Sequence, residues 1–400
     1  MGNRPKVVVV GGGALGLSAA FELTELGISD VTVIERSHVA SASSGLSVGV
    51  IEAQYLDTAS IEVRACSMEA FGRLEREHGL PITRNGYCRV GHSAADLEAF
   101  ERSVAYQHEL GITDAVVLDR GALQRLVPDL EASDLEGAMY GPSSGYIDGH
   151  LFCSLLADLL QTRGAAVLTG AELHGAEETQ KGGWRLETSR APIDADIVVN
   201  AAGAWAPRVA ALLGTRAHVL PQRHQALVAY LPRKLEYTMP MVMDYVPGTG
   251  EEGLYFRHET FESMIAGLHT EDVLHDIVDP DDYSRGDEQE FMNEVARRLV
   301  HRLPGLSATR LGNAWAGIYP TSPDGQPAVG PYRDKPSVVA ALGAGGSGVQ
   351  SAPGIGRIVA EWIVFGEPRT IGAAASLLPD RPSLQQPAVG HPGAMNPANG

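Results

Sequence analysis

The feature that most constrains the fold is a glycine-rich segment between two apolar runs near the start of the chain. Val7–Val10 is a run of four β-branched residues, typical of a parallel strand that is buried on both faces. Gly11, Gly13 and Gly16 follow with the G-x-G-x-x-G spacing, and Ala14–Leu26 continues as a predicted helix. The first glycine permits a tight turn, the second lets backbone approach a pyrophosphate, and the third lets helix and strand pack closely. The segment therefore predicts a βαβ unit that binds a dinucleotide at its helix N-terminus.

An acid closes the second predicted strand, Val31–Ile34. Glu35 lies nineteen residues after Gly16, where a carboxylate accepts hydrogen bonds from a ribose 2′-hydroxyl group. Because the same carboxylate would repel a 2′-phosphate, the sequence disfavours NADP at this site. The pattern does not identify the dinucleotide, and an ordinary glycine-rich βαβ turn is the alternative interpretation.

Length and charge limit the remaining possibilities. A chain of 400 residues is too long for one simple core, so we expect two closely joined domains. The formal net charge of -18 disfavours nucleic acid or an anionic membrane as a partner. No apolar run approaches the roughly 18 residues that span a bilayer. Cys66, Cys88 and Cys153 match neither a disulfide framework nor a zinc C-x-x-C pattern, so we expect a cytoplasmic protein with free thiols and no metal site.

Two further predicted strands end in turns of small residues. Ile197–Asn200 runs into a turn of alanines and glycine, and Val338–Ala341 runs into Gly343–Gly348. Open α/β sheets bind ligands at the carboxyl ends of their strands, so a long cofactor lying across the sheet would touch all three turns. The last turn precedes a predicted helix over Ala352–Phe365, with Pro353 in its first turn. A helix N-terminus there would stabilise the negative charge of a reduced flavin, unless the glycines serve only close packing.

The segments between these strands predict the other elements. Apolar residues recur at helical spacing in Ile61–His78, Asp96–Leu110, Leu151–Arg163 and Gln289–Leu303. Alternating segments within residues 219–269 predict a mostly antiparallel sheet. We therefore expect a discontinuous nucleotide-binding domain and a substrate domain. The predicted boundaries are 1–85, 145–214 and 305–378 for the first, 86–144 and 215–304 for the second, and 379–400 for a flexible tail.

The order of these motifs resembles that of the FAD-dependent D-amino acid oxidase, glycine oxidase and sarcosine oxidase superfamily, over the chain up to about residue 382. The motifs are Gly11–Gly16 with Glu35 and Arg36, Ser41–Gly49, Gly86 with Tyr87, Asp196–Trp205, Trp315–Gly330 and Gly343–Gly356. The stretch Gly346–Pro353 is most similar to sarcosine, dimethylglycine and archaeal proline dehydrogenases. The resemblance implies an α/β fold: a Rossmann-like FAD-binding domain of the glutathione reductase type and an α+β substrate domain on a mostly antiparallel sheet. It also implies oxidation of an amine C–N bond to an imine, which water hydrolyses.

The resemblance further implies a set of FAD-binding residues at the matching positions. They are Gly11, Gly13, Ala14, Leu15, Gly16, Glu35, Arg36, Ser43, Ser44, Gly45, Val48, Gly49, Leu173, Ala202, Gly203, Trp205, Gly345, Gly346, Ser347, Gly348, Val349 and Gln350. Sarcosine oxidase attaches FAD through a cysteine, and the matching position here is Gly317. We therefore expect FAD to be bound non-covalently.

The substrate-binding positions depart from those relatives. Glu52 and Gln350 match an arginine and a lysine that bind the substrate carboxylate in sarcosine oxidase, and Tyr319 matches an arginine of glycine oxidase. Because a glutamate repels a carboxylate, we expect either that Arg257 holds it or that the substrate presents a cation or hydroxyls there. An imidazole suits proton transfer near neutral pH, which makes His269 the candidate base. The candidate catalytic residues are His269, Tyr319, Glu52, Tyr55, Arg257 and Gln350.

The leading hypothesis is a FAD enzyme that oxidises a secondary amine or an N-substituted amino acid. Ile265 matches the oxygen-activating lysine of sarcosine oxidase, so the electron acceptor is oxygen or another compound. Two alternatives stay open: a NAD-dependent dehydrogenase that uses only the first motif, and a flavoprotein assembly or scaffold subunit without turnover. We expect a small amine or amino acid as partner, no nucleic acid, no membrane span, and a monomer or homodimer. Arg223 and His224, beside a predicted strand, are expected to be structural.

Overall fold

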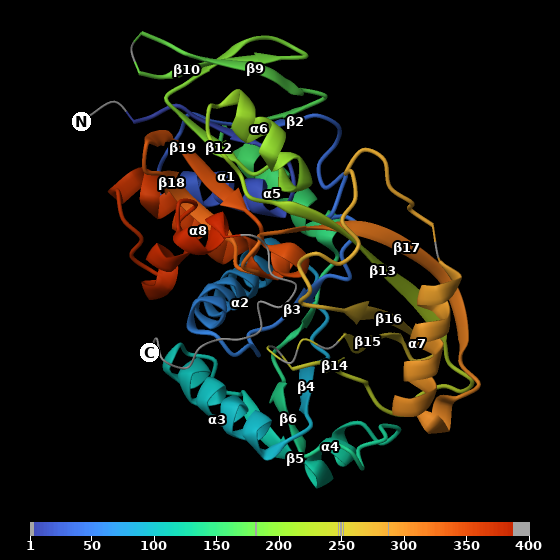
Figure 1. Cartoon of the computed structure of the whole chain (residues 1–400). Helices are drawn as coiled ribbons and strands as arrows, with labels where there is room; N and C mark the ends of the chain where they lie inside the picture. The colour runs from blue at the N-terminus through green and yellow to red at the C-terminus, as the bar shows by residue number, and fades with distance from the viewer. Residues whose placement is uncertain are drawn as a thin grey trace.

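Two large β-sheets, with helices packed on and around them, organise the chain in a computed structural model (Figure 1). The structure describes residues 4–386 except 181, 247, 249, 251 and 287. One unit contains the first strand and the last long helix. The other unit contains the helices labelled α3, α4 and α7, which lie along the bottom and the right-hand side of Figure 1.

The first sheet has six strands in the order β18-β19-β12-β1-β2-β8. They are β1 (Val7–Val10), β2 (Val31–Glu35), β8 (Ala166–Thr169), β12 (Ile197–Asn200), β18 (Ala328–Tyr332) and β19 (Lys335–Leu342). Neighbours pair in parallel except β18, which is antiparallel to β19. The carboxyl ends of β1, β12 and β19 therefore lie at one edge of the sheet, as the three small-residue turns predict.

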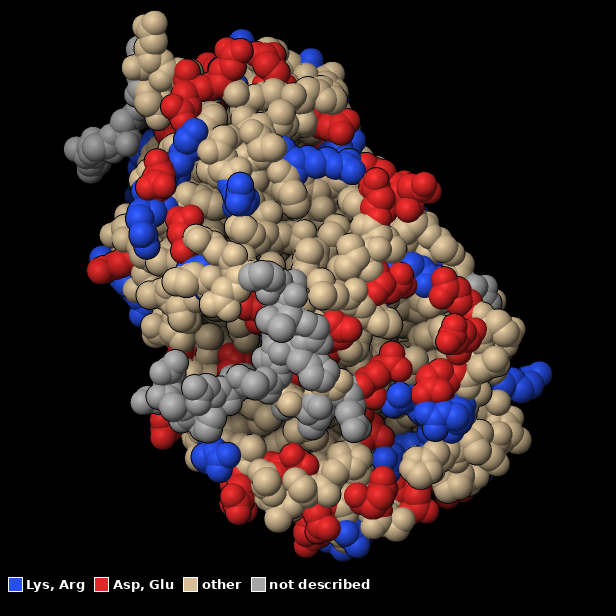
Figure 2. Space-filling model, viewed as in Figure 1, with Lys and Arg blue, Asp and Glu red and all other residues tan. Residues whose placement is uncertain are grey.

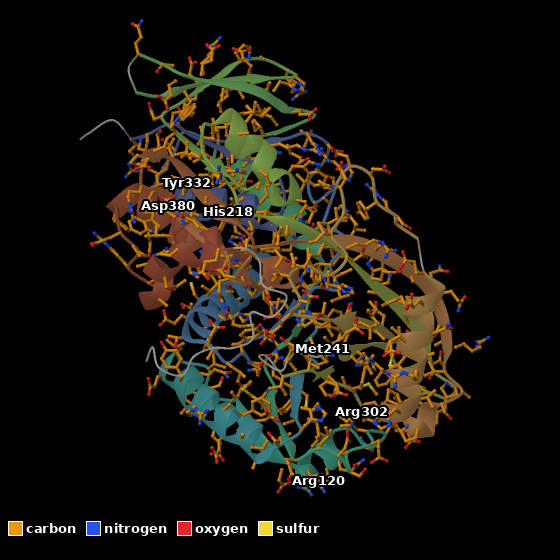
Figure 3. All side chains as sticks on the ribbon, viewed as in Figure 1. Arg120, His218, Met241, Arg302, Tyr332 and Asp380 are labelled. Carbon is orange, nitrogen blue, oxygen red and sulfur yellow. The ribbon has the colours of Figure 1, made fainter. Side chains whose placement is uncertain are left out.

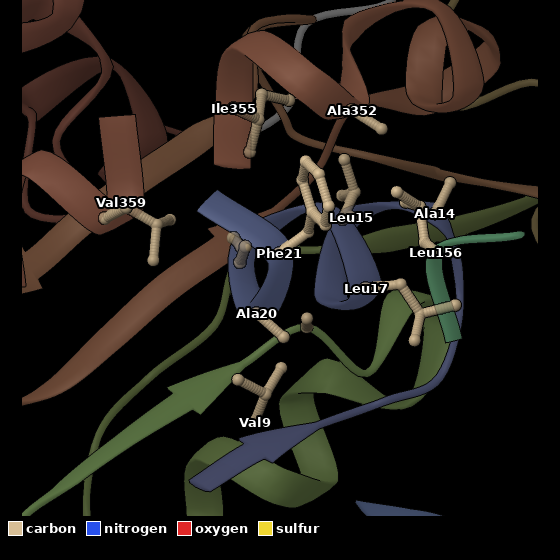
Figure 4. Close-up of a cluster of buried hydrophobic side chains, with 14 of the residues drawn as sticks. Val9, Ala14, Leu15, Leu17, Ala20, Phe21, Leu156, Ala352, Ile355 and Val359 are labelled. Carbon is tan, nitrogen blue, oxygen red and sulfur yellow. The ribbon is translucent and has the colours of Figure 1, made fainter. Parts of the chain in front are cut away.

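The central strand β1 is buried on both faces, as its run of valines predicts. Val7 and Val9 belong to a core that also contains residues of three helices, part of which Figure 4 shows. Val8 and Val10 belong to a second core on the opposite face, because successive side chains of a strand point to opposite sides. The three helices are α1 (Ala14–Glu25), α5 (Gly149–Thr162) and α8 (Gly348–Phe365). The opposite face carries α6 (Ala206–Leu212) and a small antiparallel sheet of β9 (Leu173–Glu178), β10 (Trp184–Thr188) and β11 (Ile193–Ala195).

Helix α8 packs closely against two other helices, α1 and α2 (Thr58–His78), at a pair of glycines. A Cβ at Gly356 would lie 2.6 Å from the carbonyl carbon of Ser18 on α1. A Cβ at Gly354 would lie 2.4 Å from the carbonyl oxygen of Val63 on α2. The absence of side chains at these two positions therefore lets three helices meet under the sheet.

The start of α8 differs from the prediction. The helix begins at Gly348, so Pro353 lies inside it and not in its first turn. The added turn buries Val349 and Ser351 against the rest of the protein, which local composition could not indicate. Tertiary burial therefore extends the helix toward the glycine turn.

The second sheet has eight strands in the order β17-β13-β16-β15-β14-β4-β6-β5. They are β4 (Tyr87–Gly91), β5 (Val116–Asp119), β6 (Gly137–Gly141), β13 (Leu220–Tyr230), β14 (Met241–Asp244), β15 (Gly253–Thr260), β16 (Ser263–His269) and β17 (Arg310–Thr321). Only β14 and β4 pair in parallel, so the sheet is mostly antiparallel, as predicted. Helix α7 (Gln289–Arg302) buries Phe291, Val295 and Leu299 in the core of this unit, and their spacing is the one that predicted it.

Shorter elements complete the chain. β3 (Val50–Ile51) pairs with β7 (Gly145–Tyr146). The remaining helices are α3 (Ala94–Glu109), α4 (Arg120–Leu126) and the 3-10 turns η1 (Gly203–Trp205), η2 (Pro304–Leu306), η3 (Gly345–Ser347), η4 (Gly372–Leu377) and η5 (Pro382–Gln385).

Two segments differ from the predicted domain boundaries. The boundary at residue 305 assigns β17 to the nucleotide-binding domain, yet this strand pairs with β13 in the eight-stranded sheet. Such long-range pairing is not encoded in local composition. The described part of the expected flexible tail is packed, since Leu384 is buried and Arg381 donates to Asp324 at 2.7 Å. Residues 387–400 of that tail lie outside the described residues.

The surface reflects the acidic composition. Figure 2 shows Asp and Glu side chains spread over much of one face, with Lys and Arg among them. In residues 4–386, apart from the five positions excluded above, no helix has the length and apolar character needed to cross a membrane.

Adding one methyl group at Gly356 is expected to destabilise the protein. The new Cβ of Gly356→Ala would lie 2.6 Å from the backbone of Ser18, so α8 would have to move away from α1. We expect the free energy of unfolding in a urea titration to fall by about 1–3 kcal/mol.

A matched control is Gly121→Ala in the exposed helix α4, where the new Cβ would meet no atom closer than 3.4 Å. This change is expected to be neutral or slightly stabilising, because alanine favours a helix over glycine. If Gly356→Ala unfolded at the same urea concentration as the unchanged protein, the close contact between α8 and α1 would not be needed for stability.

Candidate functional site

One cavity, with a volume of 310 Å³, is lined by both units of the molecule. One end lies at the glycine-rich turn after β1, and the lining continues past the turn after β12 to Gly345–Gln350. The far part is lined by strands of the eight-stranded sheet, including Met241 of β14, which is labelled in Figure 3. The cavity therefore follows the carboxyl edge of the first sheet and ends against the second.

The turn after β1 has the close backbone contacts that a phosphate-binding loop requires. Gly11 has a φ of +118°, and a Cβ there would lie 2.4 Å from the carbonyl oxygen of Ala201. A Cβ at Gly16 would lie 2.0 Å from the carbonyl oxygen of Gly11. Helix α1 begins after Gly13, which has no side chain to act as a cap; the Ala14 N–H donates to Ser44 Oγ at 3.0 Å, and the next N–H groups of the first turn lack a capping side chain. Backbone donors and the positive end of the helix dipole can therefore face a pyrophosphate in the cavity.

The predicted acid lies beside this turn. Glu35 accepts hydrogen bonds through Oε2 from the Gly12 N–H at 2.8 Å and through Oε1 from the Ser37 N–H at 2.9 Å. Its carboxylate lines the cavity, where it is available to a ribose hydroxyl group. Next to it, the guanidinium of Arg36 lies 3.9 Å from the ring centroid of Trp205, and both line the cavity. This pair forms a flat wall that suits a purine ring.

The loop of residues 41–49 is held over the middle of the cavity by β17. Ser43 Oγ donates to the carbonyl oxygen of Ile318 at 2.7 Å. The indole N–H of Trp315 donates to the carbonyl oxygen of Leu46 at 2.9 Å. A Cβ at Gly346 would lie 2.5 Å from the ring of Tyr319, so the last glycine turn also abuts β17. Strand β17, which the predicted boundaries assign to the nucleotide-binding domain, therefore contacts both the loop of residues 41–49 and the last glycine turn.

The structure brings together most residues of the predicted site, while their roles remain predictions. The predicted residues that line the cavity are Gly11, Gly13, Ala14, Leu15, Glu35, Arg36, Ser43, Ser44, Glu52, Tyr55, Val48, Leu173, Ala202, Gly203, Trp205, His269, Tyr319, Gly345, Gly346, Ser347, Gly348, Val349 and Gln350. Gly16, Gly45 and Gly49 do not line it. Each of the three abuts a backbone carbonyl oxygen, of Gly11, Ala40 and Ile147 respectively, and so shapes a loop instead.

Arg257, which the sequence predicted as a carboxylate-binding residue, does not line the cavity. Its side chain donates to the carbonyl oxygens of Val48 and His258, both at 3.1 Å, and pairs with Glu259. The guanidinium also lies 3.7 Å from the ring centroid of Tyr146. These partners direct the charge away from the cavity, so Arg257 cannot hold a substrate carboxylate there.

A buried ion pair lies next to the last glycine turn. Arg64 Nε donates to Glu52 Oε1 at 3.1 Å, and Arg64 Nη2 donates to Ser347 Oγ at 2.8 Å. The side chains of Arg64 and Glu52 are 4% and 2% exposed, which places the pair out of bulk solvent. Glu52 Oε2 is buried and has no hydrogen-bond partner within the part of the chain that the structure describes. A buried carboxylate oxygen without a donor is an acceptor that suits a ligand N–H or O–H group.

Aromatic side chains form the walls of the far part of the cavity. The rings of His224 and Tyr319 stack with centroids 3.9 Å apart. Burial raises the pKa of Tyr319 and that of Tyr55 to about 12, so both stay neutral near pH 7. Burial lowers the pKa of His224 well below its ordinary value, and its Nε2 atom has no hydrogen-bond partner among the described residues. His224, for which the sequence led us to expect a structural role, lines the cavity.

His269 is in the cavity, where the sequence predicted it. Its ring meets that of Tyr245 edge-on, with centroids 4.7 Å apart. Burial, followed by the positive charge of Arg89, lowers the pKa of His269 from 6.5 to about 4. The imidazole is therefore neutral at physiological pH and can accept a hydrogen bond.

Sequence reasoning missed several lining residues, among them Arg89, Tyr87 and Tyr255. Arg89 lies on β4, in which every residue is buried. A single charged residue in a short strand between two glycines is an unusual composition, and this is the signal that could have drawn attention to it. Tyr87 belongs to a motif of the family resemblance that assigned it no role, and Tyr255 carries no such signal, because aromatic residues are common in strands.

The cavity fits FAD by the chemistry of its lining. The N-terminus of α1 and a glycine turn without room for Cβ atoms suit the pyrophosphate. Glu35 suits the ribose, and the Arg36–Trp205 wall suits the adenine. At the other end α8 begins beyond Ser347, which makes no side-chain cap, so its N-terminus can stabilise negative charge on a flavin ring.

One family of known proteins matches most of the chain. The family described as FAD dependent oxidoreductase matches residues 6–362. The match covers all three glycine or small-residue turns, which excludes the alternative of a nicotinamide enzyme that uses only the first. It confirms FAD as the predicted cofactor and the predicted resemblance to amine and amino acid oxidising flavoenzymes.

Individual relatives agree with this assignment. Mitochondrial dimethylglycine dehydrogenase of Mus musculus is 24% identical over 383 residues, which cover 92% of this chain and 43% of that protein. Glycine oxidase of Geobacillus kaustophilus is 23% identical over 91% of this chain and 94% of that protein. The crystal structure of L-proline dehydrogenase from P. horikoshii has a TM-score of 0.82 and 26% identity, over 95% of this chain and 98% of that one. The chain thus spans less than half the length of the dimethylglycine dehydrogenase it matches.

Denaturing the holoprotein is expected to release intact FAD. None of the three cysteines lines the cavity, and the sequence resemblance matches Gly317, which does line it, to the position of covalent attachment in sarcosine oxidase. After acid precipitation, we expect the flavin to be in the supernatant and to have the mass of free FAD. Flavin that stayed with the pelleted protein would contradict non-covalent binding.

Proposed function

Because the chain belongs to the FAD dependent oxidoreductase family, we propose that it oxidises the C–N bond of a secondary amine or an N-substituted amino acid. In this reaction the Cα–H bond of the substrate breaks and a C=N bond forms; a secondary amine also loses its N–H proton and gives an imine, whereas a tertiary amine gives an iminium ion. FAD, when bound, supplies the acceptor for the electron pair and hydrogen of the Cα–H bond. Water then adds to the imine, which separates into a carbonyl compound and a free amine.

One observation carries this proposal. A single cavity joins a dinucleotide-binding edge to the far part of the cavity, which we call the chamber. The chamber is lined by buried aromatic side chains and by one carboxylate oxygen, Glu52 Oε2, that has no hydrogen-bond partner among the described residues. The chamber walls include Tyr87, Tyr255 and Met241, which are 2%, 4% and 2% exposed. Such walls exclude water and hold a small organic substrate in one orientation, and orientation supplies much of the rate in reactions of this kind.

Two acceptors in the chamber can bind the N–H group of the substrate. Glu52 Oε2 is buried without a donor among the described residues. Arg64, which balances the charge of Glu52, contacts the other oxygen, Oε1. His269 is neutral because its pKa is low, so it too can accept a hydrogen bond. Both groups favour an amine that donates a hydrogen bond and keep its nitrogen in a fixed position while the proton leaves.

The relatives define the class of substrates to test. Their names specify dimethylglycine, glycine and L-proline, which are amino acids with tertiary, primary and secondary nitrogen. The aromatic walls of the chamber favour a substrate with apolar carbon next to its nitrogen. We therefore place N-alkylated and cyclic amino acids ahead of glycine.

An anaerobic screen of such compounds is expected to find at least one that bleaches the flavin absorption near ~450 nm. The compounds are sarcosine, dimethylglycine, proline, iminodiacetate, glycine and the corresponding simple amines. Admitting oxygen afterwards, in parallel with an artificial electron acceptor, separates an oxidase from a dehydrogenase. If no amine in the screen bleached the flavin, the proposed reaction would be excluded in favour of a flavoprotein without turnover.

Replacing His269 by glutamine is expected to lower kcat/KM by about tenfold or more, since a hydrogen bond to the substrate nitrogen is lost. The pH profile of the unchanged enzyme should show no inflection near 6.5, the ordinary imidazole value, because the pKa of His269 is lowered to about 4. Above that pH the imidazole is already neutral, and activity should rise only as the substrate ammonium loses its proton.

A control is Gln225→Asn, a conservative change of another cavity residue of similar polarity. It is expected to leave the pH profile unchanged in shape. An inflection near 6.5 that was present in the unchanged enzyme and absent in His269→Gln would show that this imidazole titrates at its ordinary pKa during turnover.

A further inference from the structure

We propose that Arg89 binds the carboxylate of the substrate, so that the anion site of this protein lies on strand β4 of the eight-stranded sheet. This inference rests on the proposed function and specifies its substrate as an amino acid with a free carboxylate. The position is different from the two that bind carboxylate in sarcosine oxidase, which Glu52 and Gln350 occupy here.

Arg89 is buried and faces the cavity. It is 2% exposed and contributes to the cavity lining. Its Nε donates to the carbonyl oxygen of Gln54 at 3.0 Å, and its Nη1 donates to that of Tyr245 at 3.0 Å. Its Nη2 donates to the hydroxyl group of Tyr87 at 2.9 Å. A guanidinium has five N–H groups, so these three bonds leave one N–H on Nη1 and one on Nη2 for a ligand.

Among the described residues, Arg89 has no ion-pair partner. Its three partners are two carbonyl oxygens and a hydroxyl group, and within the described ranges no acidic side chain lies within 4 Å of its guanidinium nitrogens. A buried cation without an ion-pair partner is unfavourable unless an anion joins it. Since arginine stays charged in proteins, the position attracts an anionic group whenever one fits.

Glu52 acts on Arg89 only at longer range and forms its ion pair with another arginine. Glu52 is paired with Arg64, whose guanidinium lies 4.1 Å from the centroid of the Tyr55 ring. Arg89 lies 5.2 Å from the centroid of the same ring. Both arginines thus approach the ring of Tyr55, whose raised pKa keeps it neutral. Of the two, only Arg64 has an ion-pair partner among the described residues.

The same contacts hold the guanidinium in a fixed orientation. Its bonds reach Gln54 in the segment before α2, Tyr245 after β14 and Tyr87 on β4, so three segments fix the plane of the group. A fixed planar fork can bind a carboxylate through two parallel hydrogen bonds with little loss of side-chain entropy. Glu52, with its free oxygen, and Arg89 together suit the amine and the acid of one amino acid.

The test uses the FAD-loaded full-length protein and ligands that cannot be oxidised at nitrogen. Cyclopentanecarboxylate and butyrate are compared with their neutral amides, and binding is measured by the change in flavin absorption and by the rise in melting temperature. We expect the acids to bind at least about tenfold more tightly than the amides. In Arg89→Gln this preference should disappear, and in Arg89→Lys, which keeps a charge but not the fork, it should be partly retained.

The matched control is Arg257→Gln, which removes another buried arginine that does not line the cavity. It should leave the preference for acids intact, and loss of the preference there instead would overturn the proposal. Equal affinities of the unchanged protein for acids and amides would overturn it even if no variant folded. If amines bleach the flavin while acids and amides bind equally, only the role of Arg89 fails. If acids are preferred but no amine bleaches the flavin, the proposed reaction fails and the anion site stands.

Discussion

The structure depends on the contact between the first turn of α1 and the ends of β1 and β12. Gly16 lies against the carbonyl oxygen of Gly11, and Gly11 lies against that of Ala201, at distances that leave no space for a Cβ atom. This contact holds the N-terminus of α1 at the carboxyl edge of the sheet. Because β12 pairs with β1 in parallel, the turn after β12 faces the same cavity. The dinucleotide-binding edge is therefore one surface made from segments that are far apart in sequence.

A second constraint joins that edge to the rest of the site. Strands β13 and β17 pair along most of their lengths, and β17 also bonds the loop of residues 41–49 through Ile318 and Trp315. The eight-stranded sheet consequently forms the far wall of the cavity, and side chains from β4, β14, β16 and β17 face the end of the nucleotide-binding edge. Burial of this wall keeps the tyrosines protonated and the histidines neutral, so fixed charge in the chamber comes from arginine and glutamate.

Much of the fold could be predicted because its signals are local. The valine run, the glycine spacing and Glu35 lie within thirty residues or so of one another, and each has a direct physical reason in the structure. The apolar spacing of Phe291, Val295 and Leu299 likewise predicted α7. By contrast, β17 could not be assigned to its sheet, since strand pairing depends on partners distant in sequence. The start of α8 was misplaced for a similar reason, because burial of Val349 is a tertiary effect.

The same distinction between local signals and tertiary effects applies to the site. Sequence alone determined the nucleotide-binding edge, the family resemblance and the cofactor, because turns, caps and acids at fixed spacing act through neighbouring backbone. Only the tertiary structure decided which arginine of the eight-stranded sheet faces the cavity. Arg257 and Arg89 are both buried residues of strands, yet carbonyl oxygens and Glu259 hold the first away from the cavity, while the second keeps two N–H groups and no acid. The charge that a ligand meets depends on how distant groups are paired in space, and pairing of that kind exists only once the chain has folded.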